Sequence, residues 1–498
     1  MWNVKERRGV RIRPLAFAAL LPISMLALLS VSACDRSSAS QPRLGYHLVW
    51  TTKLDQNVDS SEVVALDAIT LHGERRSIVL ALAGNNDSDC QPANPVRLAT
   101  TYAFEATTGK LLWRMSTRGR SRCTTSSPAV SGGWVYSPGL DGKIHRYSLL
   151  TGREYRGHGW PEPFTLSPNF EKASSPLRVD GRYLYVTTSG YTGRPGRYQG
   201  HLVTIDLATG SESVWNSLCS NITTLINPDP RSPEYCPFTG SGIWSRSGVE
   251  VDPENGNIVL VTGNGPWNGR TNWGDSLIEL SRDGRHLLGS FTPANQAYLD
   301  HNDLDLGSTS PVMLPAVRWQ GHVVHLAIQA GKGPSGGRGG PAVVLLLDRT
   351  LWAGRPGQLG GEVATTQTPD GCEVLTAPAV WMNEDGQPFV IYADDCAVAE
   401  YRVRTPSSST PRLSMVWQFS TNQEAYTTPV VSGNILFIAH AGAVVAYDPK
   451  DGRELWSSAS PGSGGSIGLV HWEYPAVSGD MLFMTDERAR LYAYRRNQ

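Results

Sequence analysis

Short runs of alternating apolar and polar residues recur along the whole chain, and each full copy ends in an acidic residue followed by a glycine-containing turn. Tyr102–Glu105 continues through Thr107-Thr108-Gly109 to Trp113, and Leu202–Gly210 leads in the same way to Trp215. Further full or partial copies lie at Ile144–Gly152, Leu277–Gly284, Val343–Asp348, Val398–Val403, Val444–Gly452 and Leu491–Tyr494. Self-similarity at this spacing is typical of a repeat architecture.

Alternation with a period of two predicts β-strands, and the glycine turns join successive antiparallel strands. A short segment ending in proline precedes the first strand of most units. These prolines are Pro128, Pro176, Pro311, Pro378, Pro429 and Pro475. Proline suits the start of a strand, where its missing N–H breaks no ladder bond. We therefore count eight units, each made of four short strands.

The two ends of the repeat region complement each other. The last unit stops at Tyr494-Arg495-Arg496 without an outer strand, whereas Tyr46–Thr52 is a strand of that type with no unit of its own. Lending it to the last unit would leave no open sheet edge. We predict an all-β fold over residues 44–498, an eight-bladed β-propeller of four-stranded antiparallel blades closed by the N-terminal strand.

The N-terminus has the pattern of an export signal. Basic residues between Lys5 and Arg13 precede the apolar stretch Leu15–Leu29, as in a secretory signal peptide. Val31-Ser32-Ala33-Cys34 resembles the bacterial lipobox, which implies lipidation of Cys34, removal of residues 1–33 and a polar tether over 34–43. The alternative is an uncleaved anchor helix, because the apolar stretch nears the length of a membrane span. Both place the propeller in the bacterial cell envelope, facing the periplasm or the exterior.

Composition agrees with that location. The 498 residues carry a formal net charge of −1, so no basic field for nucleic acid is present, and we expect a monomer. Six cysteines besides Cys34 suggest disulfides in an oxidising compartment, although buried free thiols remain the alternative. Their grouping along the chain suggests the pairs Cys90–Cys123, Cys219–Cys236 and Cys372–Cys396.

The repeats resemble those of the pyrroloquinoline-quinone (PQQ) propeller family over nearly all of residues 46–496. The resemblance implies two different functions. Some members are PQQ-dependent alcohol and polyvinyl-alcohol dehydrogenases, and one is the non-enzymatic propeller lipoprotein of the outer-membrane protein assembly machinery. Because one fold serves both functions, the choice has to come from the site.

Residues 244–350 are similar to the dehydrogenases. Trp244 stands where those enzymes place a tryptophan beneath the flat quinone, a role that suits a large aromatic face. The segment Thr262–Asn268 resembles the enzymes' Gly-Asn-Pro segment, so the likeness makes Asn264 a Ca²⁺ ligand, and amide oxygens suit this cation. The structural alternatives are a core tryptophan and a turn asparagine.

Two acidic residues and one lysine complete the resemblance. Asp305 stands where the family carries its catalytic aspartate, which takes the alcohol's proton as hydride leaves, and Asp303 would be a second ligand or an alternative base. Lys332 lies in the segment whose Lys or Arg holds the quinone oxygens, where a cation stabilises the charge of reduction. Solvated loop acids and a surface lysine are the structural alternatives.

One departure from the dehydrogenases weakens the metal site. Their Ca²⁺-binding Glu follows a Ser-Gly pair, but here Thr192 stands at that position after Ser189-Gly190. Losing a carboxylate should weaken Ca²⁺ binding, because ligand charge tunes affinity. Two hypotheses follow. The propeller either binds PQQ and calcium and oxidises an alcohol or sugar, or it is a scaffold for an envelope protein or polymer.

Overall fold

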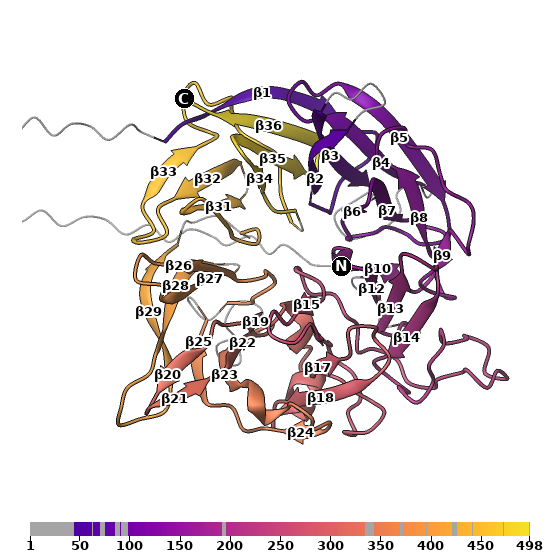
Figure 1. The fold of residues 1–498 in the computed structure, drawn as a ribbon, viewed down its shortest axis with the longest axis vertical. Helices are drawn as coiled ribbons and strands as arrows, with labels where there is room; N and C mark the ends of the chain where they lie inside the picture. The colour runs from indigo at the N-terminus through magenta and orange to yellow at the C-terminus, as the bar shows by residue number, and fades with distance from the viewer. Residues whose placement is uncertain are drawn as a thin grey trace, which may run out of the picture. The chain divides into compact units, whose positions relative to one another are not determined.

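The computed structural model describes residues 44–61, 63–69, 75–84, 90, 98–191, 196–333, 343–368, 372–394, 396–420, 426–440, 442–471 and 473–497. Over these ranges the chain forms eight blades that follow one another in sequence order around a ring (Figure 1). The predicted eight-bladed propeller is confirmed. Within the described ranges, no helix is both long and apolar enough to cross a membrane.

The first four blades use strands β2 to β18. Blade 1 contains β2 (Val63–Ile69), β3 (Arg75–Ala83), β4 (Leu98–Glu105) and β5 (Leu111–Arg118). Blade 2 contains β6 (Ala129–Ser131), β7 (Trp134–Pro138), β8 (Lys143–Ser148) and β9 (Glu162–Pro163). Blade 3 contains β10 (Lys172–Ala173), β11 (Arg178–Asp180), β12 (Tyr183–Ser189), β13 (His201–Asp206) and β14 (Glu212–Asn216). Blade 4 contains β15 (Glu250–Val251), β16 (Ile258–Val261), β17 (Leu277–Leu280) and β18 (Leu287–Thr292), joined at its edge by β24 (Gln358–Leu359).

The remaining blades follow the same order. Blade 5 contains β19 (Val312–Met313), β22 (Leu326–Ala330), β23 (Val343–Asp348) and β25 (Ala364–Gln367). Blade 6 contains β26 (Ala379–Met382), β27 (Pro388–Ala393), β28 (Val398–Arg404) and β29 (Arg412–Phe419). Blade 7 contains β30 (Val430–Ser432), β31 (Ile435–His440), β32 (Ala443–Tyr447) and β33 (Glu454–Ser457). Blade 8 contains β34 (Ala476–Ser478), β35 (Met481–Asp486), β36 (Arg490–Arg496) and, from the N-terminus, β1 (Tyr46–Lys53).

A few short elements lie between the strands of blades 4 and 5. They are the helix α1 (Gln296–His301), the 3-10 turns η1 (Leu306–Ser308) and η3 (Arg349–Leu351), and a hairpin of β20 (Val317–Trp319) and β21 (His322–Val324). Helix α1 and turn η1 carry the chain from blade 4 to blade 5. They matter because the candidate site forms beside them.

The hydrophobic core lies between the blades. The eight largest clusters of buried apolar side chains each combine residues of two neighbouring blades. The cluster that contains Phe437 and Leu482, for example, joins blades 7 and 8. Because alternate residues of a strand face opposite sides, each inner strand contributes to two such clusters. This explains why the middle strands are buried on both faces.

The recurring glycine and tryptophan of the repeat bind neighbouring blades together. Trp113 of blade 1 donates its indole N–H to Leu149 O in the turn of blade 2, at 2.8 Å. Its ring covers Gly152 of that turn, where an added Cβ would lie 2.7 Å from the ring. Trp417 makes the same contact, donating to Pro449 O at 2.9 Å. The turn therefore needs a glycine, both for its positive φ and to admit the indole.

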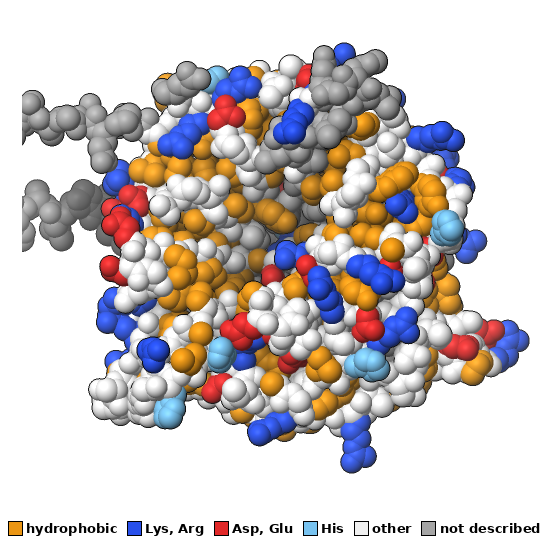
Figure 2. Space-filling view, viewed as in Figure 1, with side chains coloured by type: hydrophobic (Ala, Val, Ile, Leu, Met, Phe, Trp, Pro, Cys, Tyr) orange, Lys and Arg blue, Asp and Glu red, His pale blue; other side chains and the backbone are white. Residues whose placement is uncertain are grey.

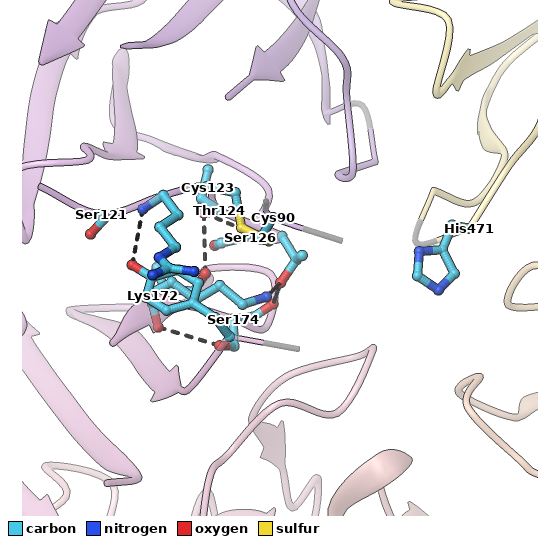
Figure 3. The surroundings of a disulfide bond; sticks show 12 residues. Cys90, Ser121, Cys123, Thr124, Ser126, Lys172, Ser174 and His471 are labelled. Carbon is cyan, nitrogen blue, oxygen red and sulfur yellow. Dashed lines mark hydrogen bonds between the residues drawn. A yellow bond between two sulfur atoms is a disulfide. The ribbon is translucent and has the colours of Figure 1, made fainter. Parts of the chain in front are cut away.

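Three disulfides tie down loops of the propeller. The structure pairs the cysteines as their grouping suggests, as Cys90–Cys123, Cys219–Cys236 and Cys372–Cys396. The first pair packs against the buried ring of Tyr191 and lies near Lys172, as Figure 3 shows. Cys34 and Thr192 lie outside the described residues.

Candidate functional site

Trp244, Asn264, Asp305 and Lys332 lie together where blades 4 and 5 meet. Asp305 lies at their centre, since its Oδ1 accepts the backbone N–H of Asn264 at 2.7 Å and its carboxylate accepts a hydrogen bond from Trp244. The backbone N–H of Lys332 donates to Asp305 O at 2.9 Å. The structure thus brings these predicted positions together, and we call this group, together with Asp275, the aspartate site.

The hairpin of blade 4 supplies two of the site's oxygen-bearing side chains. Strands β16 and β17 are paired, so the residues that follow the first and precede the second lie close together. Asn264 Nδ2 accordingly lies 3.4 Å from Asp275 Oδ2 and donates to Leu299 O of α1 at 2.9 Å. Asp275 Oδ1 accepts the backbone N–H of Leu306 at 3.1 Å. The hairpin, α1 and η1 therefore hold each other in register around the site.

Two carboxyl groups in the site have raised pKa values. Burial raises the pKa of Asp275 well above its ordinary range, and the charge of Asp305 adds to this effect. Burial also raises the pKa of Asp305, although the Asn264 N–H and the Lys332 charge work against it. Burial and the nearby aspartates raise the pKa of Tyr198 from blade 3. Negative charge is therefore crowded here, and a cation would relieve the crowding.

The backbone around the site adopts uncommon conformations. Ser241, Asp275 and Asp303 all have a positive φ, at 53°, 50° and 57°. Such residues often cluster where function requires a fixed geometry. Position 263 requires a glycine, because an added Cβ would collide with the Asp305 carboxylate and lie 3.1 Å from Trp244 Nε1. The approach of Trp244 to Asp305 thus depends on this glycine.

The donor atoms of the site fit a hard divalent cation. Asn264 Oδ1 is buried and has no hydrogen-bond partner within the part of the chain that the structure describes. Leaving such an oxygen unpaired costs free energy, which a metal ion would recover. The amide oxygen of Asn264 and the carboxylate of Asp275 are oxygen ligands of the kind that Ca²⁺ prefers.

Asp303 differs from Asp305 in its surroundings. Its side chain is 81% exposed and forms an ion pair with Lys332 Nζ at 2.8 Å. Burial acts to lower the pKa of Lys332, but the bond to Asp303 and the charge of Asp305 outweigh it and raise that pKa. Lys332 is thus a fixed cation at the edge of the site. Asp303 holds that cation, whereas Asp305 accepts hydrogen bonds from Asn264 and Trp244.

Sequence analysis missed Asp275, Gln296 and Tyr198. Gln296 lies in α1 and donates to Gly265 O at 3.0 Å, and its Nε2 is also 3.4 Å from Asp275 Oδ2. The signal for Asp275 is an acid two residues before the strand Leu277–Leu280, in the same hairpin as Asn264. Tyr198 gives no such signal, because its position depends on how blade 3 packs beside blade 4.

Other charged groups nearby serve blade contacts. Arg349 forms ion pairs with Asp252 and, at 3.2 Å, with Glu254. The segment that begins at Asp252 is the turn of the β15–β16 hairpin, closed by the Asp252 N–H to Asn257 O bond at 2.8 Å. Residues 252–257 therefore form a hairpin turn.

Sequence comparison places the chain in a family. The family described as outer membrane protein assembly factor BamB matches residues 45–231 and 414–498, which together are more than half of the chain. The chain belongs to this family. No curated protein sequence matches the chain significantly.

Solved structures extend the comparison beyond the BamB family. The chain is similar to a quinohemoprotein alcohol dehydrogenase, ADHIIG, from Pseudomonas putida HK5, with 14% identity, a TM-score of 0.59 and coverage of 91% of this chain and 76% of that one. The quinohemoprotein alcohol dehydrogenase from Comamonas testosteroni is 14% identical, with a TM-score of 0.57 and coverage of 90% of this chain and 76% of that one. BamB from Moraxella catarrhalis is 13% identical, with a TM-score of 0.50 and coverage of 90% of this chain and 99% of that one. At these identities the likeness establishes the fold alone.

Proposed function

We propose that this propeller binds Ca²⁺ and PQQ at the aspartate site and oxidises an alcohol or sugar there. The observation that carries the proposal is the convergence of Trp244, Asn264, Asp305 and Lys332, which lie on separate segments of blades 4 and 5. Asn264 and Asp275 would hold the cation beside Asp305. Trp244 and Lys332 would hold the quinone, which when bound supplies the hydride acceptor.

The protein's own part in this reaction is binding and proton transfer. The Asp305 carboxylate would accept the hydroxyl proton of the substrate, and its raised pKa makes it a stronger base than an ordinary aspartate. The Asn264 N–H and the Trp244 indole keep the carboxylate in one orientation. The Lys332 ammonium, positioned by Asp303, would stabilise negative charge that develops on a bound acceptor.

Binding of PQQ with Ca²⁺ is the first expected result. Isothermal titration in millimolar Ca²⁺ should give a saturable PQQ signal, and the folded state should gain roughly 2.7 kcal/mol at 100 times the dissociation constant. Asn264→Ala should weaken Ca²⁺ binding because it removes the unpaired buried oxygen. Asn383→Ala, in an exposed turn of blade 6, is the matched control. Titrations showing no PQQ binding would refute the enzymatic proposal.

Thr192 offers a gain-of-function arm for the same titration. Thr192→Glu should tighten Ca²⁺ binding, because it restores the carboxylate that the dehydrogenases carry at this position. If the parent protein binds Ca²⁺ and the variant binds it with the same affinity, residue 192 does not take part in Ca²⁺ binding. The proposed ligand set would then consist of Asn264 and Asp275 alone.

A scaffold role is the second candidate, and membership of the BamB family supports it. In that case the blade loops would bind a protein or polymer of the envelope, and the aspartate site would serve the packing of blades 4 and 5. Absence of PQQ binding together with a stable complex formed with an envelope component would favour this function.

We also propose that the protein is held in the cell envelope by a lipid on Cys34. The basic and apolar segments before Cys34 support this location. Cys34→Ala should move the protein from the membrane fraction to the soluble fraction, since the thiol is the point of attachment. Retention of the variant in membranes would instead favour an uncleaved helix over Leu15–Leu29 as the anchor.

A further inference from the structure

A cavity of about 210 Å³ lies between blades 4 and 5, apart from the aspartate site. Val259 of β16 lines it, whereas Asn264 of the aspartate site follows the other end of the same strand. Part of the lining is apolar, because Val259, Met313 and Trp352 belong to one hydrophobic cluster. The volume is below the roughly 300–1,000 Å³ of sites for drug-sized ligands. The cavity therefore fits a molecule of a few heavy atoms.

Glu279 of β17 adds a carboxylate to this lining. Its side chain is only 7% exposed. Glu279 is the cross-strand partner of Val259, and partners in a ladder lie on the same face of the sheet. Val259 packs with Leu345 and Leu347 of blade 5. Glu279 is therefore an acid on a face between two blades that is otherwise largely apolar.

Other blades fill the position of Glu279 differently. It stands two residues before Ser281, the first residue of the turn after β17. In blade 2 the same position is Arg146, whose guanidinium is covered by the ring of Trp134 at 4.3 Å. In blades 1, 5 and 7 it is an apolar residue buried against the next blade, namely Ala103, Leu346 and Ala446. Of these five blades, only blade 4 has an acid at this position.

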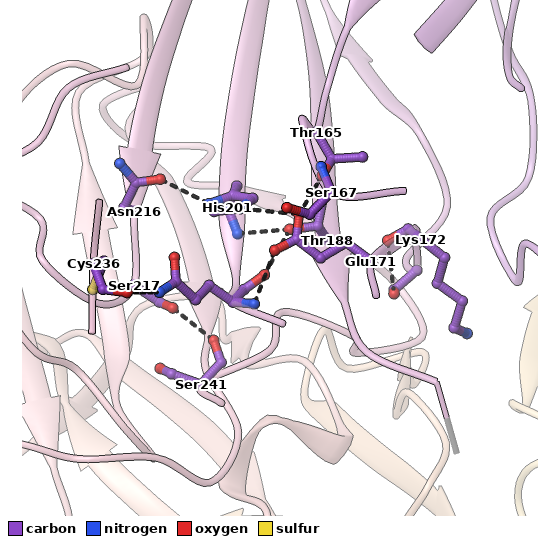
Figure 4. A network of polar contacts seen from close by, with 12 residues as sticks. Thr165, Ser167, Glu171, Lys172, Thr188, His201, Asn216, Ser217, Cys236 and Ser241 are labelled. Atoms are coloured by element: carbon purple, nitrogen blue, oxygen red, sulfur yellow. Dashed lines mark hydrogen bonds and ion pairs between the residues drawn. The ribbon is translucent and has the colours of Figure 1, made fainter. Parts of the chain in front are cut away.

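The Glu279 carboxylate has one amide partner and no cation partner. Its Oε1 accepts a hydrogen bond from Asn257 Nδ2 at 2.7 Å, and no basic side chain of the described residues forms an ion pair with it. Buried Glu171 of blade 3 shows the contrast, since it lies 3.2 Å from His201 Nε2 and accepts the Gln199 N–H at 3.1 Å (Figure 4). A buried carboxylate without a cation is costly, so a cationic ligand would stabilise Glu279.

The arginine of the cavity is engaged by other acids. Arg349 forms ion pairs with Asp252 and, at 3.2 Å, with Glu254, which also lies 2.8 Å from His325 Nδ1. Three carboxylates thus outnumber the arginine and the histidine. Among the described residues, no three ligand atoms of these acids and His325 lie within 4.8 Å of one another. The geometry therefore favours an organic cation over a metal ion.

We infer that this cavity binds a small primary amine, with its ammonium group on Glu279 and its alkyl chain against Val259 and Met313. An ammonium has three N–H donors and forms strong hydrogen bonds with a carboxylate, and the apolar part of the lining suits a short alkyl chain. Figure 2 shows basic and acidic side chains interspersed over the face in view, so no broad field of one sign covers that face. The inference does not depend on the quinone.

Calorimetric titration with n-butylamine in an amine-free phosphate buffer at neutral pH tests the inference. Butylamine should give saturable binding, whereas butyramide, which is of similar size but uncharged, should not. Glu279→Gln keeps an oxygen for Asn257 and should weaken binding at least about tenfold, the loss expected for one charge-assisted contact. Glu384→Gln, at a glutamate 86% exposed, is the matched control. Equal binding of the two probes, or unchanged affinity in Glu279→Gln, would overturn the inference.

A second variant tests the cavity without altering its charge. Ala353 is exposed and lines the cavity, so Ala353→Phe should occupy part of its volume and abolish butylamine binding while Glu279 stays in place. Ala208→Phe, in an exposed turn of blade 3, is the matched control and should bind as the parent protein does. Full binding by Ala353→Phe would place the amine elsewhere and contradict the proposed site.

Methyl NMR on the parent sequence makes the test independent of variant folding. In protein labelled at its methionine methyl groups, butylamine should shift the signal of Met313, which lines the cavity. The signal of Met415, 48% exposed in blade 6, should not move. A Met313 signal that stays unmoved at about 10 mM butylamine, or one that responds to Ca²⁺ and not to the amine, would overturn the inference.

Discussion

Replacing Asp305 with asparagine should lower the turnover of a PQQ-dependent reaction by about 10²–10⁴-fold, the usual contribution of a positioned base. The amide keeps an oxygen to accept the Asn264 N–H, which lies 2.7 Å away in the parent protein. The site should therefore keep its shape and its PQQ affinity while losing the proton acceptor. Reduction of an artificial electron acceptor with an alcohol substrate measures the rate, and calorimetry measures the affinity.

The pH profile gives a second readout of the same residue. Because the pKa of Asp305 is raised above that of an ordinary aspartate, the carboxyl should be protonated and inactive at acidic pH. Turnover should rise with pH through that raised pKa and should fall as pH drops below it. Glu384→Gln, at a glutamate 86% exposed beside Lys450, should leave both rate and profile unchanged. Full activity in Asp305→Asn would assign the base to another group.

The fold was predictable from sequence because each repeat carries its own contact to the next. The glycine turn and the outer tryptophan recur together, and the structure explains the pairing. Trp113 docks on the turn that contains Gly152, one blade further along. A local pattern therefore encodes a contact between neighbouring units. Closure by Tyr46–Thr52 was predictable in the same way, because the last unit lacks an outer strand and Tyr46–Thr52 has the pattern of an outer strand.

The candidate site was only partly predictable. Asn264 and Lys332 each follow the end of a strand in consecutive blades, and Asp305 lies on the connection between those blades. Their order along the chain therefore suggests that they meet. Asp275 needed the register of the β16–β17 hairpin, which pattern alone does not give. The buried side chains of Lys172 and Arg246 both interact with the charge of Asp59, which precedes the first blade. That convergence arises from ring closure, and no local sequence signal records it.

Deleting Tyr46–Lys53 should cause the largest loss of stability. Strand β1 pairs with β36 from Tyr46–Arg496 to Lys53–Arg490, so its removal exposes the backbone edge of β36. It also removes the contacts of Tyr46 with Trp456 of blade 7, at a ring distance of 5.2 Å. An open edge invites pairing with other chains. We therefore expect aggregation on size-exclusion chromatography and loss of cooperative thermal unfolding.

Point variants of β1 test whether stability depends on its contacts with blade 1 rather than on the presence of the strand alone. Trp50 donates to Ala106 O of blade 1 at 3.0 Å, and its ring covers Gly109, so it joins the last blade to the first. Trp50→Ala should cost about 2 kcal/mol, below the cost for a fully buried tryptophan because Trp50 is partly exposed. Val49→Ala, at a neighbour 36% exposed, should change stability little.

A synthetic 46–53 peptide should restore cooperative unfolding to the deletion variant, because it refills the vacant strand position. A deletion variant that stays monomeric with an unchanged Tm would show that the eight blades hold together without this strand.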